Sequence, residues 1–155
     1  MSIESGLYIV VNKANGHNIG RYPVEDRSLL PKRVMVLPQG VQAPMWIIEK
    51  KPDSNYTMKA GGAPASTQNS LLFVSLIDGI PPPAASWCIT ATPQHGENTY
   101  IIELDDKSAG WVVPDTNPDG GDLVQVQVKP LISTKSMPPQ YPATELFTLI
   151  RIDRE

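Results

Sequence analysis

No stretch of this chain keeps a helical spacing of apolar residues without being cut by a proline or a glycine. The 155 residues include 16 prolines and 11 glycines, which divide the sequence into short runs rich in β-branched and aromatic residues. One run, Leu123 to Val128, alternates apolar and polar residues in the manner of a strand with one buried face. The sequence therefore predicts an all-β fold with almost no helix, and it argues against helical bundles and coiled coils.

About twelve runs have the length and composition of strands. The expected strands are 7–11, 18–21, 33–37, 45–50, 56–60, 63–67, 71–76, 86–91, 100–104, 111–113, 123–128 and 146–152.

The size and charge of the chain limit the classes of partner. A chain of 16.9 kDa is long enough to form one domain over residues 1–155 and short enough to need no second one. Sixteen acidic and thirteen basic side chains give a net charge of -3, which is too weak for electrostatic binding of nucleic acid or an anionic membrane. No apolar run approaches the roughly 18 residues of a spanning helix. We expect no nucleic-acid or membrane partner.

The chain has one cysteine, Cys88, which cannot form an internal disulfide. The first residues show neither the basic nor the apolar region of a secretory signal. We therefore expect a cytoplasmic, monomeric protein. Since Cys88 lies between Trp87 and Ile89, we expect an inert thiol in the core.

Aromatic residues recur where three successive parts of the chain open and close. The openings carry Tyr8, Tyr56 and Tyr100, and the closings carry Trp46, Trp87 and Phe147. Three units of about four strands, none able to bury its apolar face alone, predict a six-stranded barrel capped by three hairpins, the β-trefoil. The closing aromatics would form a core layer. An immunoglobulin-like sandwich is the main alternative, but it usually has about seven strands.

Two segments carry a resemblance to a known family. The segment 20–34 contains Glu25-Asp26-Arg27-Ser28, and the chain ends in Glu145-Leu146-Phe147 followed by Ile150-Arg151-Ile152-Asp153. Together with the strand around Trp46, they resemble the mushroom serine protease inhibitors of the β-trefoil, Kunitz-like type. The resemblance runs from end to end, and it implies inhibition of trypsin-like serine proteases by an exposed loop. Members of that family present different loops, so the reactive loop has to be argued from the residues themselves.

A substrate-like inhibitor offers one side chain, at the position called P1, to the main specificity pocket of the protease. A trypsin-like pocket has an aspartate at its floor and accepts Lys or Arg at P1. Lys51 and Lys129 are unsuitable because a proline follows each, and Lys107 lies in a short acidic turn. The basic residues committed to predicted strands are Arg33, Lys50, Lys59 and Arg151. Two long loops remain.

The first loop spans residues 132–142. Three prolines stiffen the part after Lys135 and favour an extended backbone. Lys135 is the first candidate for P1, with Thr134, Ser136 and Met137 as flanking contacts. The alternative is a solvated lysine in a proline-rich connection.

The second loop spans residues 22–32. Its Arg27-Ser28 pair makes Arg27 the second candidate for P1, although Glu25 and Asp26 could pair with the guanidinium instead. The family resemblance places P1 nearer the start of this loop, at Arg21, Tyr22 or Pro23, which would change the specificity. Two reactive loops would make the protein bivalent.

The remaining motifs predict no metal, cofactor or enzymatic activity. Asp115 to Gly120 reproduces the first half of a calcium loop, but the last ligand position is Val126. His17 and His95 lie in glycine-bearing turns without the spacing of a metal site or a catalytic triad, and we expect both at the surface. No nucleophile or acid/base pair emerges.

Two alternative functions fit the same scaffold. A β-trefoil lectin is one, but the Gln-x-Trp signature of ricin-type lectins is missing, because Pro44 and Ala85 stand two residues before Trp46 and Trp87. An inhibitor of papain-like cysteine proteases is the other.

Overall fold

The computed structural model describes residues 3–14, 16–21, 32–37, 45–53, 55–60, 63–75, 85–114 and 124–152. The strands are β1 (Gly6–Asn12), β2 (Ile19–Arg21), β3 (Lys32–Val36), β4 (Trp46–Lys50), β5 (Tyr56–Ala60), β6 (Ala63–Gln68), β7 (Leu71–Val74), β8 (Trp87–Ala91), β9 (Thr99–Leu104), β10 (Gly110–Val112), β11 (Val124–Gln125), β12 (Gln127–Lys129) and β13 (Phe147–Arg151). The two short 3-10 helices are η1 (Pro93–His95) and η2 (Ala143–Glu145). The all-β prediction is confirmed. Neither helix in these ranges has the length or apolarity to cross a membrane.

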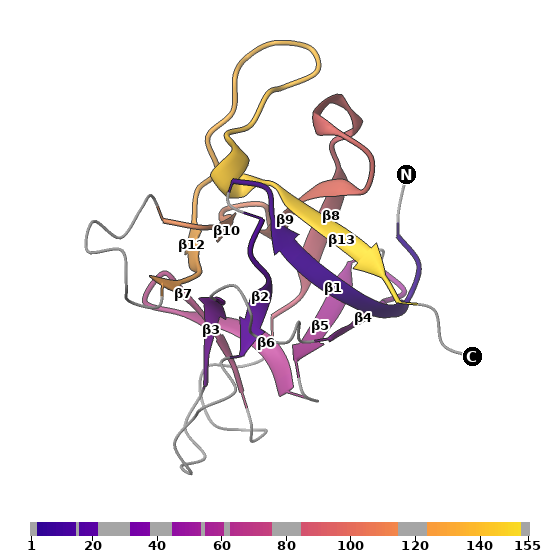
Figure 1. The fold of residues 1–155 in the computed structure, drawn as a ribbon, viewed down its shortest axis with the longest axis vertical. Helices are drawn as coiled ribbons and strands as arrows, with labels where there is room; N and C mark the ends of the chain where they lie inside the picture. Colours follow the sequence, from indigo (N-terminus) through magenta and orange to yellow (C-terminus); the bar gives the residue numbers. More distant parts are fainter. Residues whose placement is uncertain are drawn as a thin grey trace.

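Six strands form a closed barrel. The antiparallel pairings run from β1 to β4, β5, β8, β9 and β13, and β13 pairs again with β1. Figure 1 shows β13, in yellow, lying along β1, in indigo. The first and last of the described strands are therefore neighbours in the barrel.

Three hairpins extend the barrel. They consist of β2 with β3, β6 with β7, and β10 with β12. The hairpins also pair with one another, since β7 contacts both β3 and β12. Backbone groups that a lone hairpin would leave open are thus bonded to the next hairpin.

The register explains why aromatic residues recur in the sequence. Directly opposite each other on neighbouring barrel strands are Tyr8 and Trp46, Tyr56 and Trp87, and Tyr100 and Phe147. Each opening tyrosine therefore pairs with the closing aromatic of its own unit. Cross-strand aromatic pairs of this kind stabilise a sheet, and the same pair occurs three times around the barrel.

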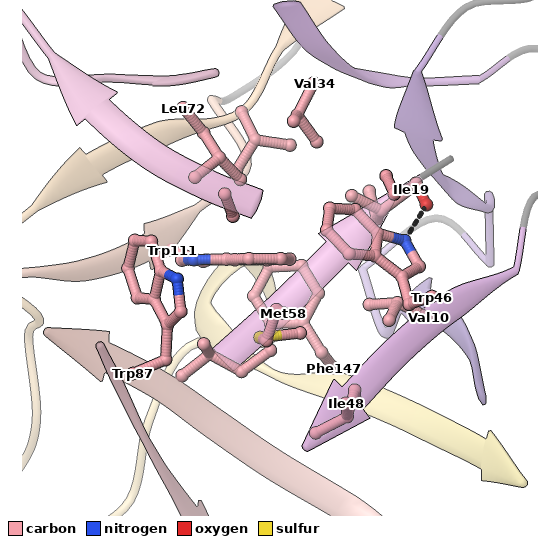
Figure 2. Packing of buried hydrophobic residues seen from close by; sticks show 14 of the residues in the cluster. Val10, Ile19, Val34, Trp46, Ile48, Met58, Leu72, Trp87, Trp111 and Phe147 are labelled. Carbon is pink, nitrogen blue, oxygen red and sulfur yellow. Dashed lines mark hydrogen bonds between the residues drawn. The ribbon is translucent and has the colours of Figure 1, made fainter. Parts of the chain in front are cut away.

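The three closing aromatics meet at a fourth aromatic residue, Trp111 of β10 (Figure 2). The ring centroid of Trp111 lies 5.4 Å from Trp46, 5.6 Å from Trp87 and 5.8 Å from Phe147. All four side chains are completely buried. The indole nitrogen of Trp46 donates a hydrogen bond of 2.8 Å to the carbonyl oxygen of Ile19 (Figure 2). The closing aromatics form a core layer as expected, with Trp111 at its centre.

One predicted strand is split. The run 123–128 contains β11, which pairs with β3, and β12, which pairs with β10 and β7. Val126 lies between them: its N–H bonds to Val34 and its carbonyl accepts from Leu72. Val126 and Val128 are buried, and the glutamines between and beside them are half-buried. The predicted alternation of burial therefore holds, although the two halves of the run pair with different strands.

The expectation of a core thiol at Cys88 is wrong. Successive residues of β8 face opposite sides of the sheet, and Trp87 and Ile89 take the buried side. Cys88 is only half-buried, with its sulfur 3.7 Å from the hydroxyl of Thr90, the next residue on the outer side. Its chain neighbours are apolar because they face the core, and Cys88 faces outward.

Candidate functional site

The loop between β12 and η2, residues 130–142, is a projecting part of the structure. It forms the tall orange-to-yellow arch at the top of Figure 1. The side chain of Met137 is 93% exposed and that of Ile132 is 71% exposed. Lys135 is also exposed, and none of the residues that the structure describes forms an ion pair or side-chain hydrogen bond with it. Its ammonium group is available to a partner.

Hydrogen bonds within the loop hold its tip. The N–H of Thr134 donates to the carbonyl of Gln140 at 2.9 Å, and the N–H of Gln140 donates to the hydroxyl of Thr134 at 2.9 Å. The hydroxyl of Ser136 donates to the carbonyl of Pro138 at 2.9 Å and lies 2.6 Å from the hydroxyl of Thr134. Because each hydroxyl has one proton, Thr134 is the donor to Ser136. Two of the predicted flanking contacts therefore brace the loop internally.

This bracing changes one expectation about the backbone. The prolines after Lys135 favour an extended chain, but residues 135–138 bend. The bend follows from the two hydrogen bonds between Thr134 and Gln140, which bring the two sides of the loop together. Lys135 and Met137 are carried on the bend.

Both ends of the loop are fixed to other elements. On the β12 side, the N–H of Ile132 donates to the Glu145 carboxylate of η2 at 2.8 Å. On the η2 side, the amide of Gln94 donates to the carbonyl of Pro139 at 2.7 Å, and the N–H of Tyr141 donates to Nε2 of His95 at 3.0 Å. We call the set of these bonds the clamp of the loop. It joins η1 and η2 to the segment that carries Lys135.

Glu145 is an unusual component of the clamp because its side chain is only 2% exposed. Burial raises the pKa of its carboxyl group; the bond from Ile132 lowers it in part, and the nearby Glu103 raises it again. The second carboxyl oxygen, Oε1, has no hydrogen-bond partner among the described residues. The structure thus buries a carboxyl group to hold one backbone N–H of the loop.

His95 is the clamp residue whose position was predicted wrongly from the sequence. We expected a surface histidine in a turn, but the side chain is half-buried, and its ring lies 6.2 Å from the ring of Tyr141. The two residues are 46 positions apart in the chain. No local sequence signal connects them, because η1 belongs to the β8–β9 connection.

Arg21, a candidate from the second loop, lies at the end of β2. Its backbone is opposite Val34 of β3, and its guanidinium donates to the carbonyl of Ala60 at 3.3 Å. The side chain is half-buried, and it ties the β2–β3 hairpin to β5. The other candidates of this loop, Tyr22, Pro23, Arg27 and Ser28, lie outside the described residues, as does the calcium-like segment 115–120.

The basic residues assigned to strands are found there. Arg33, Lys50, Lys59 and Arg151 belong to β3, β4, β5 and β13. Lys59 pairs with Glu49 at 3.5 Å and Arg151 with Glu4 at 3.4 Å. Within the described ranges no group of three or more His, Cys, Asp or Glu side chains is placed to hold a metal ion.

Comparison with known proteins decides the family. A model of the peptidase inhibitor I66 family matches residues 1–151. The chain belongs to the peptidase inhibitor I66 family. This confirms the expectation of an inhibitor rather than an enzyme, and the resemblance carried by segments 20–34 and 145–153.

The I66 chain is similar to two fungal inhibitors over almost its whole length. It is 38% identical over 156 residues to a serine protease inhibitor of Lentinula edodes, covering 98% of this chain and 100% of the relative. Its structure matches that of a proteinase inhibitor from Coprinopsis cinerea with a TM-score of 0.86 and 43% identity, covering 97% of this chain and 100% of the other. A designed 3-fold symmetric protein, ThreeFoil, matches with a TM-score of 0.67 at 15% identity, covering 95% of this chain and 99% of the other, and shows the fold alone.

Proposed function

We propose that this I66 chain inhibits trypsin-like serine proteases and that Lys135 is its P1 residue. The observation that carries the proposal is an exposed lysine without a partner in the described residues, on a loop that is braced internally and clamped at both ends. The named function of the Lentinula edodes relative supports the serine protease class. The lysine supports the trypsin-like specificity, because an aspartate at the floor of the pocket attracts its ammonium group.

The bracing favours tight binding. A free loop loses conformational entropy when it enters an active site, whereas a loop that is already held in place loses less. The long side chain of Lys135 is the main group left to be ordered. We expect the binding energy to concentrate on this residue, as it does on the buried anchors of protein interfaces in general.

The same bracing opposes net cleavage. Attack of the protease serine on the carbonyl carbon of Lys135 breaks the bond to Ser136 and releases the Ser136 amine, which takes its proton from the catalytic histidine. The bonds among Thr134, Ser136, Pro138 and Gln140 keep the new amine beside the acyl group. High effective concentration of the amine then favours re-formation of the peptide bond.

The finer fold assignment belongs to the same proposal. A closed six-stranded barrel, three mutually paired hairpins and a threefold repeat of one cross-strand aromatic pair support a β-trefoil. We propose one such domain over residues 1–155, acting as a monomer.

The test is a titration of trypsin activity with the wild-type protein and three variants. Lys135→Ala is expected to raise the inhibition constant at least about 30-fold, corresponding to the roughly 2 kcal/mol or more that an interface anchor contributes. Lys135→Arg keeps the charge and should inhibit. Lys129→Ala is the matched control: this exposed lysine at the end of β12 precedes Pro130, and its removal should leave inhibition unchanged.

Each variant is checked for folding by circular dichroism. Lys135→Ala that inhibits as well as the wild type overturns the assignment of P1, and Arg27→Ala then tests the second loop. A protein that inhibits papain but not trypsin overturns the trypsin-like specificity.

A further inference from the structure

We propose that His95 is a positioning residue for the Lys135 loop and that its protonation releases one end of the loop, so that inhibition weakens as the pH falls below neutral. The inference rests on the proposed function, because it concerns the loop that carries Lys135. It adds a residue outside the loop, and a dependence on pH, to the determinants of inhibition.

The argument starts from the direction of one hydrogen bond. The backbone N–H of Tyr141 donates to Nε2 of His95 at 3.0 Å. A neutral imidazole has one acceptor nitrogen, and a protonated imidazole has none. The observed bond therefore requires the proton of neutral His95 on Nδ1. Adding a second proton at Nε2 turns the contact into two N–H groups facing each other.

The remainder of the clamp does not share this sensitivity. The amide of Gln94 and the carbonyl of Pro139 do not titrate. Glu145 accepts the N–H of Ile132 as a carboxylate, and a protonated carboxyl group still has a carbonyl oxygen that can accept. The hydrogen bond from the N–H of Tyr141 to His95 is thus the bond of the clamp that acidification breaks.

The surroundings of His95 contain charges of both signs. The Tyr141 ring packs against the imidazole, and the pKa of Tyr141 is raised by burial and then by Glu103 and Glu145, which places both carboxyl groups near this contact. The adjoining Glu97 is exposed. On the basic side, Lys13 lies next to Gly96 at the end of η1, and Lys107 lies near Glu103. The charged side chains around His95 in the described residues are thus three glutamates and two lysines.

Loss of this bond reaches the bend through a short path. Tyr141 directly follows Gln140, which closes the tip of the loop with Thr134. When the Tyr141 N–H has no acceptor, the bond that Gln94 of η1 donates to the carbonyl of Pro139 is the remaining clamp bond between η1 and the segment Pro139–Tyr141. The closure of the tip is then less well fixed, and the protease has to order it on binding.

The test compares three variants at pH 8.0 and pH 5.5. His95→Gln places an amide oxygen near the position of Nε2 and does not titrate, so it keeps the acceptor at both pH values. His95→Phe keeps a ring against Tyr141 but has no acceptor. His17→Gln removes the other histidine of the chain and serves as the control.

Inhibition of trypsin gives the first readout, always as a ratio of variants at the same pH, so that the pH dependence of trypsin itself cancels. Wild type and His95→Gln should agree at pH 8.0. At pH 5.5 the wild type should be weaker than His95→Gln, because a protonated imidazole offers no acceptor to the N–H of Tyr141, whereas the amide oxygen of Gln still does. His95→Phe should be weaker than wild type at pH 8.0 already, and His17→Gln should follow the wild type throughout.

Amide hydrogen exchange of Tyr141 gives a second readout that needs no protease. At pH 5.5 this amide should exchange faster in the wild type than in His95→Gln, and at pH 8.0 the two should agree. Equal exchange and equal inhibition of these two proteins at pH 5.5 overturn the role of His95. If the protein shows the expected exchange pattern but does not inhibit trypsin, the positioning role of His95 is supported and the proposed function is refuted.

Discussion

Two buried tryptophans that look alike in the sequence should respond differently to the same substitution. Trp46 and Trp111 are both fully buried, and their rings are in contact. The indole nitrogen of Trp46 donates to the carbonyl of Ile19 at 2.8 Å. The indole nitrogen of Trp111 has no acceptor among the described residues. Replacing either by phenylalanine keeps an aromatic ring and removes the same number of atoms.

The hydrogen bonds set the difference between the two variants. Trp46→Phe removes the donor of a buried bond, and a buried polar group left unsatisfied costs about 1–3 kcal/mol. Trp111→Phe removes an indole N–H that is already unsatisfied. The free energy of unfolding then rises by a similar amount, which offsets part of the stability lost with the packing contacts. We therefore expect Trp46→Phe to be at least about 2 kcal/mol less stable than Trp111→Phe. For a chain of this size that corresponds to a difference in Tm of about 4–8 °C.

Thermal and urea unfolding followed by far-UV circular dichroism measure this difference directly. Trp87→Phe is a useful third variant, because the indole nitrogen of Trp87 also has no partner in the described part of the chain, and it should behave like Trp111→Phe. Equal losses of stability in Trp46→Phe and Trp111→Phe would refute the reasoning, since volume alone would then explain both.

Two further predictions concern the loop. Thr134→Val removes the hydroxyl that closes the tip with Gln140, so inhibition of trypsin should weaken about fivefold, corresponding to a hydrogen bond of roughly 1 kcal/mol. Thr134→Ser should retain inhibition, and equal inhibition constants for Thr134→Val and the wild type would contradict the bracing. Glu145→Gln keeps an acceptor for Ile132 but removes the buried carboxyl. Because burial raises the pKa of Glu145 in the folded state, the wild type loses stability as the pH rises from the unfolded to the folded pKa, by about 1.4 kcal/mol per pH unit. The Tm of Glu145→Gln relative to wild type should therefore be higher at pH 8 than at pH 4, and a difference that is the same at both pH values would contradict this.

The parts of the fold that depend on neighbouring residues along a strand were predictable. The pairing of an opening tyrosine with a closing aromatic residue, as in Tyr8 and Trp46, recurs because the same cross-strand position occurs three times. Trp111 has no counterpart in the repeat of openings and closings, because it belongs to a hairpin strand, and its central place in the core appears only when the hairpins are assembled.

The candidate site was predictable in part for the same reason. The exposure of Lys135 follows from a long, proline-rich connection. The bond that Tyr141 donates to His95 and the bond that Gln94 donates to Pro139 join residues about 45 positions apart, and they depend on how η1 is placed against the loop. The bend at residues 135–138 likewise depends on a closing bond across the loop, which outweighs the extended preference of residues before proline.

The pairing of β1 with β13 also has a consequence for how the nascent chain matures. About 135 residues separate the end of β1 from the start of β13, and at a synthesis rate of roughly 5–20 residues per second they take about 7–27 seconds to make. Within this time β1 gains β4 on one side only, and β9, once it has been made, also waits for β13. Open strand edges attract strands of other chains. β13 is thus the strand that covers both edges and ends this period of exposure.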